Sequence, residues 1–214
     1  MINWQDIDTV LLDMDGTLLD LHYDNHFWMT HLPERYAVIN NIAVKDAHLQ
    51  LAAHIESQRG TLNWYCLDYW SEQLALDITA LKKETRNRIK ERPYARDFLQ
   101  FLQNSGKTSY LVTNAHPAGV AIKFAETTIE PFFEEVISSH QFQEPKEVAA
   151  FWQALAEHIS FDPKRTLFID DNVDVLNAAK AFGIKHTMGI HQPDSQRERL
   201  LENTQAIHHF TEIM

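Results

Sequence analysis

Short apolar runs recur along the chain, and several of them are rich in β-branched residues. The clearest are Thr9–Leu12, 109–112, 135–137 and 166–169, with a weaker one near 185–187. Runs of this length that end in polar residues predict strands. Their apolar character is continuous rather than alternating, which is typical of strands buried on both faces of a sheet.

Helical periodicity fills the intervals between the later runs. Val148, Trp152, Leu155 and Ile159 are spaced by four, three and four residues and therefore share one helix face. The segment 96–104 has the same character and ends at a Ser-Gly pair, and 173–182 is followed by Gly183, a usual helix stop. From about residue 94 onward strands and helices alternate, which predicts an α/β fold with a parallel sheet covered by helices on both faces.

The interval 20–92 differs from the rest. It contains helical stretches and many aromatic residues but no convincing strand. A crossover between parallel strands needs only about a dozen residues. We therefore expect a core made of residues 1–19 and 93–214, and an α-helical insertion at 20–92 (hereafter the insertion).

Composition narrows the function classes. The 214 residues include 19 basic and 30 acidic side chains, for a net charge of −11. Such a chain repels a phosphate backbone, which argues against general nucleic-acid binding. Cys66 is the single cysteine, which excludes a disulfide within the chain and a zinc site of several cysteines. The first residues, MINWQDIDTV, show no signal peptide, and no run approaches a membrane span, so we expect a cytoplasmic protein.

Polar residues follow the first predicted strand. Asp13 and Asp15 stand two residues apart directly after it, and Gly16 permits a tight turn. Both carboxylates can then face the crevice above the sheet. An ordinary surface turn would use the same residue types, but the apolar strand directly before them favours a site.

Candidate phosphate ligands follow the second and third strands. Thr113 and Asn114 could hold a phosphoryl oxygen together with backbone N–H groups, or could simply cap a helix that begins near Pro117. Lys146 is expected in the first turn of the helix that carries Val148. A lysine is unfavourable there unless it faces an anion, and the alternative is a solvated side chain.

Two adjacent carboxylates, Asp170 and Asp171, end the fourth strand. Buried neighbours of like charge repel one another, and a hard cation relieves this. Oxygen-only ligands favour Mg²⁺ over zinc or copper. A helix cap would explain one aspartate but not both. All four features follow the carboxyl ends of different strands, where open α/β sheets bind their ligands.

These motifs resemble those of the haloacid dehalogenase superfamily. LLDMDGT matches its first motif, LVTN the second, Lys146 the third and LFIDDN the fourth, in order over essentially the whole chain. The resemblance implies a Rossmann-like core with an inserted helical cap of that family's first type. The segments TLNWYCLDYW and TNAHP further resemble the bacterial GMP/IMP 5′-nucleotidase branch.

Departures from the family pattern are confined to two places. Proline commonly follows the family lysine, whereas here Pro145 precedes Lys146 and Glu147 follows it. Many relatives carry a further acid four residues after the metal-binding one. That position is Val175, with Asp174 beside it.

The resemblance assigns roles to the candidate residues. Asp13 is the nucleophile that forms an aspartyl-phosphate, and Asp15 is the general acid and base. Asp13, the Asp15 backbone carbonyl and Asp171 bind Mg²⁺, with Asp170 beside or bound to the ion. Thr113, Asn114 and Lys146 bind phosphoryl oxygens.

Several related activities share these motifs. The second aspartate favours a phosphatase over a dehalogenase, and a phosphonatase would need a Schiff-base lysine in the insertion, where Lys45, Lys82 and Lys83 stand in no evident apolar niche. A phosphomutase or a small sugar-phosphate phosphatase remains an alternative. A non-enzymatic sensor would require loss of Asp13 or Asp15.

Substrate choice is expected to reside in the insertion. Its aromatic residues could stack on a purine ring, and Asn63 and Asp68 could hydrogen-bond its edge. The aromatic residues are Trp28, Trp64, Tyr65, Tyr69 and Trp70. Together with the closer resemblance, this favours purine nucleoside 5′-monophosphates such as GMP and IMP as substrates.

Overall fold

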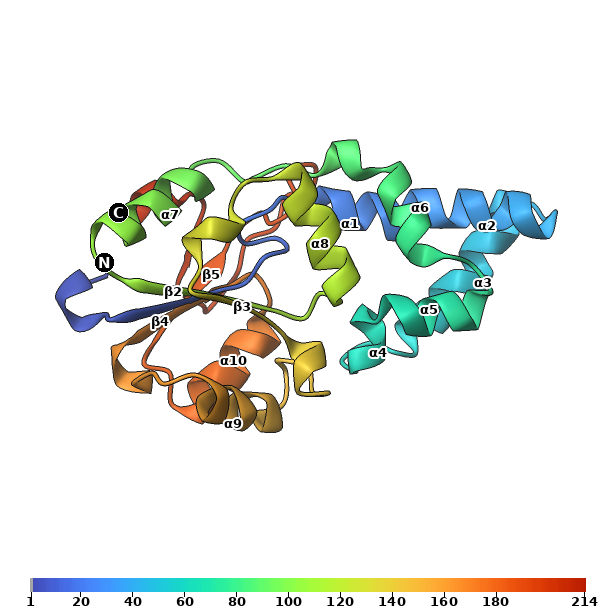
Figure 1. Cartoon of the computed structure of the whole chain (residues 1–214). Helices are drawn as coiled ribbons and strands as arrows, with labels where there is room; N and C mark the ends of the chain where they lie inside the picture. The colour runs from blue at the N-terminus through green and yellow to red at the C-terminus, as the bar shows by residue number, and fades with distance from the viewer. Residues whose placement is uncertain (1) are drawn as a thin grey trace.

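The core is a six-stranded, all-parallel sheet in the computed structural model, which describes residues 2–214 (Figure 1). The strand order is β3-β2-β1-β4-β5-β6. The strands are β1 (Thr9–Leu12), β2 (Thr108–Thr113), β3 (Glu135–Ser138), β4 (Thr166–Asp170), β5 (His186–Ile190) and β6 (Ala206–Ile207). The predicted α/β parallel sheet is confirmed. The sequence did not reveal β6, because two residues are too few to form a pattern.

Helices cover both faces of this sheet. Figure 1 shows α7 (Ala95–Asn104) and α8 (Pro117–Glu126) on one face and α9 (Ala149–His158) and α10 (Val173–Phe182) on the other. Alternate residues of β1 enter two separate cores: Val10 and Leu12 pack with α7, whereas Leu11 packs with α9 and α10. Because both faces are covered, the consecutive residues Val10, Leu11 and Leu12 are all apolar, as expected.

The chain between β1 and α7 is helical. It forms α1 (His22–His26), a π-helical turn (Phe27–His31), α2 (Leu32–Asn40), α3 (Val44–Glu56), α4 (Leu62–Tyr65), α5 (Leu67–Leu74) and α6 (Ile78–Glu84). These helices enclose a hydrophobic cluster of their own, centred on Phe27, Leu51 and Trp70. They lie beside the sheet rather than upon it (Figure 1).

The two connections between the core and this helical segment run side by side and are hydrogen-bonded to each other. The Asp20 N–H donates to the Lys90 carbonyl at 2.9 Å, and the Arg92 N–H donates to the Leu18 carbonyl at 2.8 Å. The guanidinium of Arg92 is buried and donates to the carbonyls of Gln192, His191 and His208. The two connections therefore leave the core side by side.

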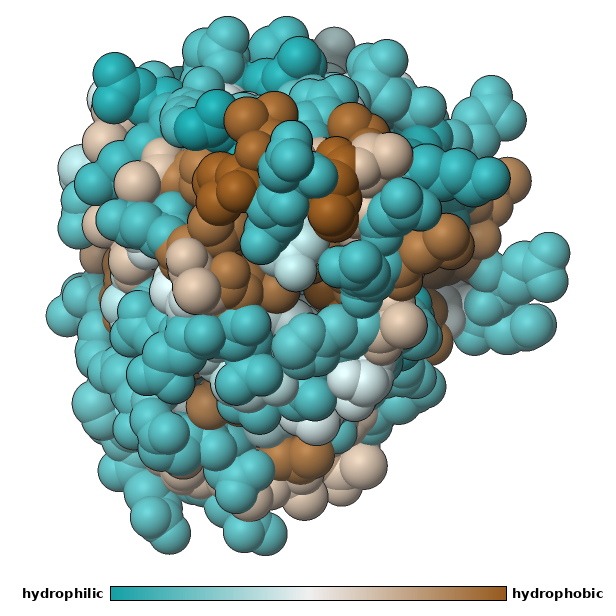
Figure 2. Space-filling model, turned by 90° about the vertical axis from the view of Figure 1, so that its right-hand side faces the viewer, coloured by the Kyte–Doolittle hydropathy of each residue, from teal (hydrophilic) through white to brown (hydrophobic). Residues whose placement is uncertain are grey.

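The far end of the insertion exposes apolar side chains. Figure 2 views the molecule from the side on which the insertion lies and shows hydrophobic residues gathered in the upper part of that face. On α2 and α3 the exposed large hydrophobic residues are Val38, Ile39, Val44 and Leu49. Within residues 2–214, no helix has both the length and the apolar character needed to cross a bilayer.

A pair of glycine substitutions tests the helix assignments. Gly183 ends α10 with φ of +119°, whereas Gly119 lies inside α8, where an added Cβ would meet its nearest neighbour at 3.7 Å. Gly183→Ala should destabilise the protein by about 1–2 kcal/mol, because L-residues are strained in that region. Gly119→Ala should stabilise it by about 0.5–1 kcal/mol.

Thermal unfolding measures both changes, at about 2–4 °C per kcal/mol for a chain of this size. Equal shifts of the same sign in the two variants would contradict these helix assignments.

Candidate active site

The carboxyl ends of β1, β2 and β4 bring the candidate residues together. Asp13 follows β1, Thr113 ends β2 and Asp170 ends β4. Because neighbouring strands are parallel and in register, these ends share one edge of the sheet. A small cavity of about 120 Å³ opens there, and it is lined by all the residues predicted for the site: Asp13, Asp15, Thr113, Asn114, Lys146, Asp170 and Asp171.

Gly16 makes the turn after β1 possible. Its φ is +85°, and a Cβ added to it would stand 2.7 Å from Cγ of Asp171. The turn is closed by the Gly16 N–H, which donates to the Leu19 carbonyl at 2.8 Å. Glycine is thus required both for the backbone conformation and for the approach of Asp171 to the first loop.

Three carboxylates crowd this edge, two of them buried and that of Asp171 partly exposed. One oxygen each from Asp13, Asp170 and Asp171 lies within 4.8 Å of the others. Burial raises the pKa of Asp13 to about 7, against the attraction of Lys146 and with the help of Asp170. Burial and the charge of Asp13 likewise raise the pKa of Asp171 to about 7. The cluster therefore carries strong repulsion that added positive charge relieves.

The donor set fits a hard divalent cation. It consists of carboxylate oxygens only, as Mg²⁺ prefers. Asp170 has both oxygens engaged within the protein: Oδ1 accepts from the Asn172 N–H at 2.8 Å, and Oδ2 accepts from Lys146 at 2.7 Å. Asp13 and Asp171 are thus the carboxylates better placed to hold an ion.

Lys146 is the positive charge at the centre of the site. Its Nζ donates to Asp13 Oδ1 at 2.6 Å, to Asp170 Oδ2 at 2.7 Å and to the Val112 carbonyl at 3.0 Å. Burial lowers the pKa of this lysine, but the two carboxylates outweigh it and raise the pKa overall. The ammonium group therefore remains charged.

The expected position of Lys146 in a helix is wrong. It lies in a turn, and α9 begins only at Ala149. The alternative of a solvated lysine is also wrong, since Lys146 is 2% exposed. The turn is held by Trp152, whose Nε1 donates to the Lys146 carbonyl at 2.8 Å. The side chain therefore reaches the carboxylates without opposing the helix dipole.

Thr113 and Asn114 line the same small cavity as the carboxylates. The Thr113 hydroxyl accepts from the Ala115 N–H at 3.0 Å. The Asn114 side chain accepts from the Lys146 N–H at 2.9 Å and donates to Glu147 at 2.9 Å. Helix α8 is capped by His116 rather than by either of them. Asn114 thus fixes the loop that carries the lysine.

Asp15 belongs to a chain of alternating charges that sequence reasoning missed. Lys123 Nζ donates to Asp15 Oδ2 at 2.6 Å and stands 3.0 Å from Asp24 Oδ2, and Lys82 Nζ donates to Asp24 Oδ1 at 2.6 Å. Within residues 2–214, Asp15 Oδ1 is buried without a hydrogen-bond partner. Lys123 left one signal, because it is the only charged residue in the stretch 115–125.

Lys82 corrects a second expectation. We expected no lysine of the insertion in an apolar niche, yet Lys82 is 2% exposed, and its Nζ lies 4.7 Å from the ring centre of Phe27 and 4.8 Å from that of Tyr23. Burial lowers its pKa, against the attraction of Asp24. Lys82 is held by an ion pair, which differs from the unpaired amine that Schiff-base chemistry requires.

A second link joins the insertion to the core. The Tyr65 hydroxyl donates to Glu147 Oε1 at 2.6 Å, and Glu147 Oε2 accepts from Asn114. Glu147 is the residue that replaces the proline usual in the family.

The position of the further acid found in many relatives is Val175, which lines the small cavity. Its neighbour Asp174 is exposed, and the Asp174 N–H donates to the Asn172 side chain. Asp174 therefore does not join the carboxylates.

A larger cavity of about 600 Å³ adjoins the small one. Asp15 and Tyr65 line both cavities. Its other walls include Trp28, Trp64 and Trp70 of the insertion and Lys123 of the core. Asn63 and Asp68 are exposed and do not line this cavity, so the structure does not bring them to it.

Comparisons with known proteins agree with this geometry. The chain is 46% identical over 194 residues to the GMP/IMP nucleotidase YrfG of Escherichia coli K12, covering 91% of this chain and 87% of that protein. It is 24% identical over 217 residues to a phosphoglycolate phosphatase of Nitrosococcus oceani, covering 91% and 94% of the two chains. The crystal structure of a HAD phosphatase from Thermococcus onnurineus superposes with a TM-score of 0.81 at 18% identity, covering 96% and 95%.

The sequence profile of one family accounts for most of the chain. It matches residues 7–183, which include β1, the insertion, Lys146 and both carboxylates after β4. The parallel sheet and the motif order agree with this match. The chain belongs to the haloacid dehalogenase-like hydrolase family.

Proposed function

We propose that the protein is a Mg²⁺-dependent phosphoric monoester hydrolase that acts through an aspartyl-phosphate, with purine nucleoside 5′-monophosphates such as GMP and IMP as substrates. The observation that carries the proposal is the placement of Asp13: it is held by Lys146 beside Asp171 and opens into the small cavity. The 46% identity to a GMP/IMP nucleotidase supports the choice of substrate.

Asp13 and Asp15 divide the chemistry between them. An Asp13 oxygen attacks phosphorus, and the bond from phosphorus to the ester oxygen breaks. Protonated Asp15 gives its proton to the departing alkoxide. Asp15 then takes a proton from water, which attacks the aspartyl-phosphate and releases inorganic phosphate with Asp13 restored.

The surrounding residues supply electrostatic stabilisation and position. Lys146 favours the anionic form of Asp13 against the effect of burial and, with Thr113 and Asn114, is proposed to face the phosphoryl oxygens. Mg²⁺ held by Asp13, Asp171 and the Asp15 backbone carbonyl would offset the negative charge that develops on the phosphoryl group. Lys123 holds the Asp15 carboxylate at 2.6 Å and so fixes the direction in which it delivers its proton.

The insertion, residues 20–92, is proposed to act as the cap over this site. It contributes Tyr65 and the aromatic walls of the larger cavity, while the core contributes the carboxylates. Its closure would exclude water from the phosphoryl group. Domain motion would pivot on the paired connections at Leu18–Asp20 and Lys90–Arg92.

Asp13→Asn should lower kcat by about three orders of magnitude or more, because an amide cannot form the acyl phosphate. The fold should persist, since Lys146 retains Asp170 as a partner. Steady-state phosphate release measures the loss. The matched control is Asp8→Asn, an exposed aspartate at the other end of β1, which should retain full activity. More than a few per cent of activity in purified Asp13→Asn contradicts the assignment.

Removal of divalent cations by a chelator should abolish turnover, and added Mg²⁺ should restore it, because the three carboxylates otherwise repel the incoming phosphate. Asp171→Ala should raise the Mg²⁺ concentration needed for half-maximal activity more than Asp170→Ala does. Asp170 serves mainly to hold Lys146, so its loss should lower kcat instead. Full activity in metal-free protein contradicts the Mg²⁺ requirement. A larger Mg²⁺ requirement in Asp170→Ala than in Asp171→Ala contradicts the roles assigned to the two aspartates.

The larger cavity supports a purine substrate. Its volume of about 600 Å³ falls in the range of small-molecule sites. Trp70 is committed to packing, with its Nε1 donating to the Trp64 carbonyl and its ring in edge contact with Trp28. Trp64 is half-buried and faces the cavity beside Arg59. Stacking of a base on such a ring contributes about 1–3 kcal/mol.

GMP and IMP should therefore show higher kcat/KM than UMP or a hexose phosphate. Trp64→Ala should reduce the preference for purine over hexose phosphate by about tenfold or more, equivalent to the loss of one stacking contact. Tyr69→Ala is the control, since Tyr69 lies outside the cavity lining. If kcat/KM for a hexose phosphate exceeds that for GMP by tenfold, the protein is a sugar-phosphate phosphatase rather than a nucleotidase. The proposed phosphatase chemistry would still hold.

A further inference from the structure

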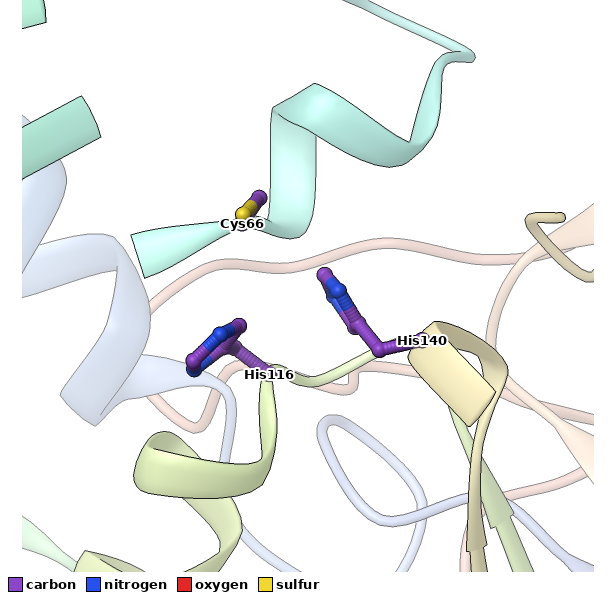
Figure 3. Close-up of side chains that lie close together, drawn as sticks. All are labelled: Cys66, His116 and His140. Atoms are coloured by element: carbon purple, nitrogen blue, oxygen red, sulfur yellow. The ribbon is translucent and has the colours of Figure 1, made fainter. Parts of the chain in front are cut away.

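Cys66, His116 and His140 converge at the boundary between the insertion and the core. A sulfur or ring nitrogen from each lies within 4.8 Å of the others. Cys66 stands between α4 and α5, His116 caps α8, and His140 lies in the 3₁₀ turn Ser139–Gln141 after β3. Figure 3 shows the side chains of these three segments facing a common gap.

His140 offers a nitrogen that the protein does not use. Its Nε2 is buried and has no hydrogen-bond partner in the part of the chain that the structure describes. Burial lowers the pKa of His140 to about 4, with help from neighbouring His116, and a hydrogen bond to the backbone of Asn114 acts in the opposite direction. In the tautomer protonated on Nδ1, Nε2 carries the lone pair that a metal ligand needs. The imidazole rings of His116 and His140 pack edge to face, with their centres 4.9 Å apart.

Local capping explains the other two residues only in part. Cys66 Sγ accepts from the Tyr69 N–H at 3.4 Å, and His116 Nδ1 accepts from the Ala118 N–H at 3.3 Å. Both bonds are long. His116 Nε2 remains, and it lies 3.4 Å from Asp68 Oδ2. Neither cap accounts for the buried, unpaired nitrogen of His140.

We propose that Cys66, His116 and His140 bind a borderline-soft divalent cation of the Zn²⁺ class, with Asp68, which lies beside His116, as a further oxygen donor. Zinc bonds of about 2.0–2.3 Å place tetrahedral donor atoms about 3.4–3.7 Å apart. The three donor atoms here lie within 4.8 Å of one another, so they must approach by about 1 Å to bind the ion. Coordination through His116 Nε2 leaves the proton on Nδ1 and ends the long bond from Ala118.

The donor chemistry separates this site from the carboxylate cluster. A thiolate with imidazoles selects Zn²⁺ or Co²⁺, whereas oxygen-only ligands select Mg²⁺. A cation here joins Cys66 of the insertion to two histidines of the core and therefore fastens α5 over the site. The inference is independent of the substrate and the reaction proposed above.

Co²⁺ is the probe, added to purified protein with Mg²⁺ in large excess to occupy the carboxylates. Wild type should bind one equivalent and develop the near-ultraviolet charge-transfer band of a thiolate–Co²⁺ bond, and Zn²⁺ should displace it. Cys66→Ser should abolish the band yet keep the fold, because the serine hydroxyl can accept the Tyr69 N–H in place of the Cys66 sulfur. His140→Ala should weaken binding by about 100-fold or more.

The matched control is His158→Ala, which removes a histidine bound to Glu135 elsewhere on the core and should bind Co²⁺ like wild type. Hydrogen exchange in α5 should slow with Zn²⁺ in wild type and remain unchanged in Cys66→Ser. Absence of the charge-transfer band in wild type, or equal affinity in wild type and Cys66→Ser, overturns the proposal whatever the outcome for the hydrolase activity.

Discussion

The rest of the site depends on one buried ammonium group among buried carboxylates. Lys146 donates to Asp13, to Asp170 and to a backbone carbonyl of β2, which uses all three of its protons. Without it, the desolvated carboxylates of Asp13 and Asp170 would share one sheet edge with no ammonium group between them. The pKa of Asp13 is raised to about 7 even with the lysine in place, because burial outweighs the ion pair. The site is therefore built to accept further positive charge.

This constraint extends outward through the loops that hold Lys146. Asn114 binds its backbone N–H, Glu147 binds Asn114, and Tyr65 of the insertion binds Glu147. A separate chain runs from Asp15 through Lys123 to Asp24 and Lys82. Asp13 and Asp15 are thus each connected to the insertion by a chain of hydrogen bonds and ion pairs. A movement of the insertion alters the surroundings of both groups together.

The sequence predicted what depends on local pattern. Continuous apolar runs located β1, β2, β3 and β4, because both faces of the sheet are covered. Polar residues directly after those runs identified Asp13, Thr113, Asn114 and the pair after β4, because parallel strands end at one edge. Lys146 was identified by its motif but placed in the wrong element, since the turn that carries it depends on Trp152 and Asn114.

Long-range partners could not be predicted in the same way. Lys123 and Asp15 are 108 residues apart, and their pairing follows from how α8 lies against the first loop. Lys82 looked like a solvated charge, and only the packing of α6 against α1 buries it against Tyr23. Cys66, His116 and His140 belong to three segments whose approach no spacing in the chain reveals.

If Asp13 is the nucleophile, it carries a phosphoryl group during turnover. The most direct measurement is acid quenching of the enzyme in the steady state with GMP and Mg²⁺, followed by peptide mass spectrometry. The peptide that contains Asp13 should carry one added phosphoryl group, which is lost on mild alkaline treatment and absent from Asp13→Asn. A burst of product with no phosphoryl group on that peptide, or a phosphoryl group on another residue, would contradict it.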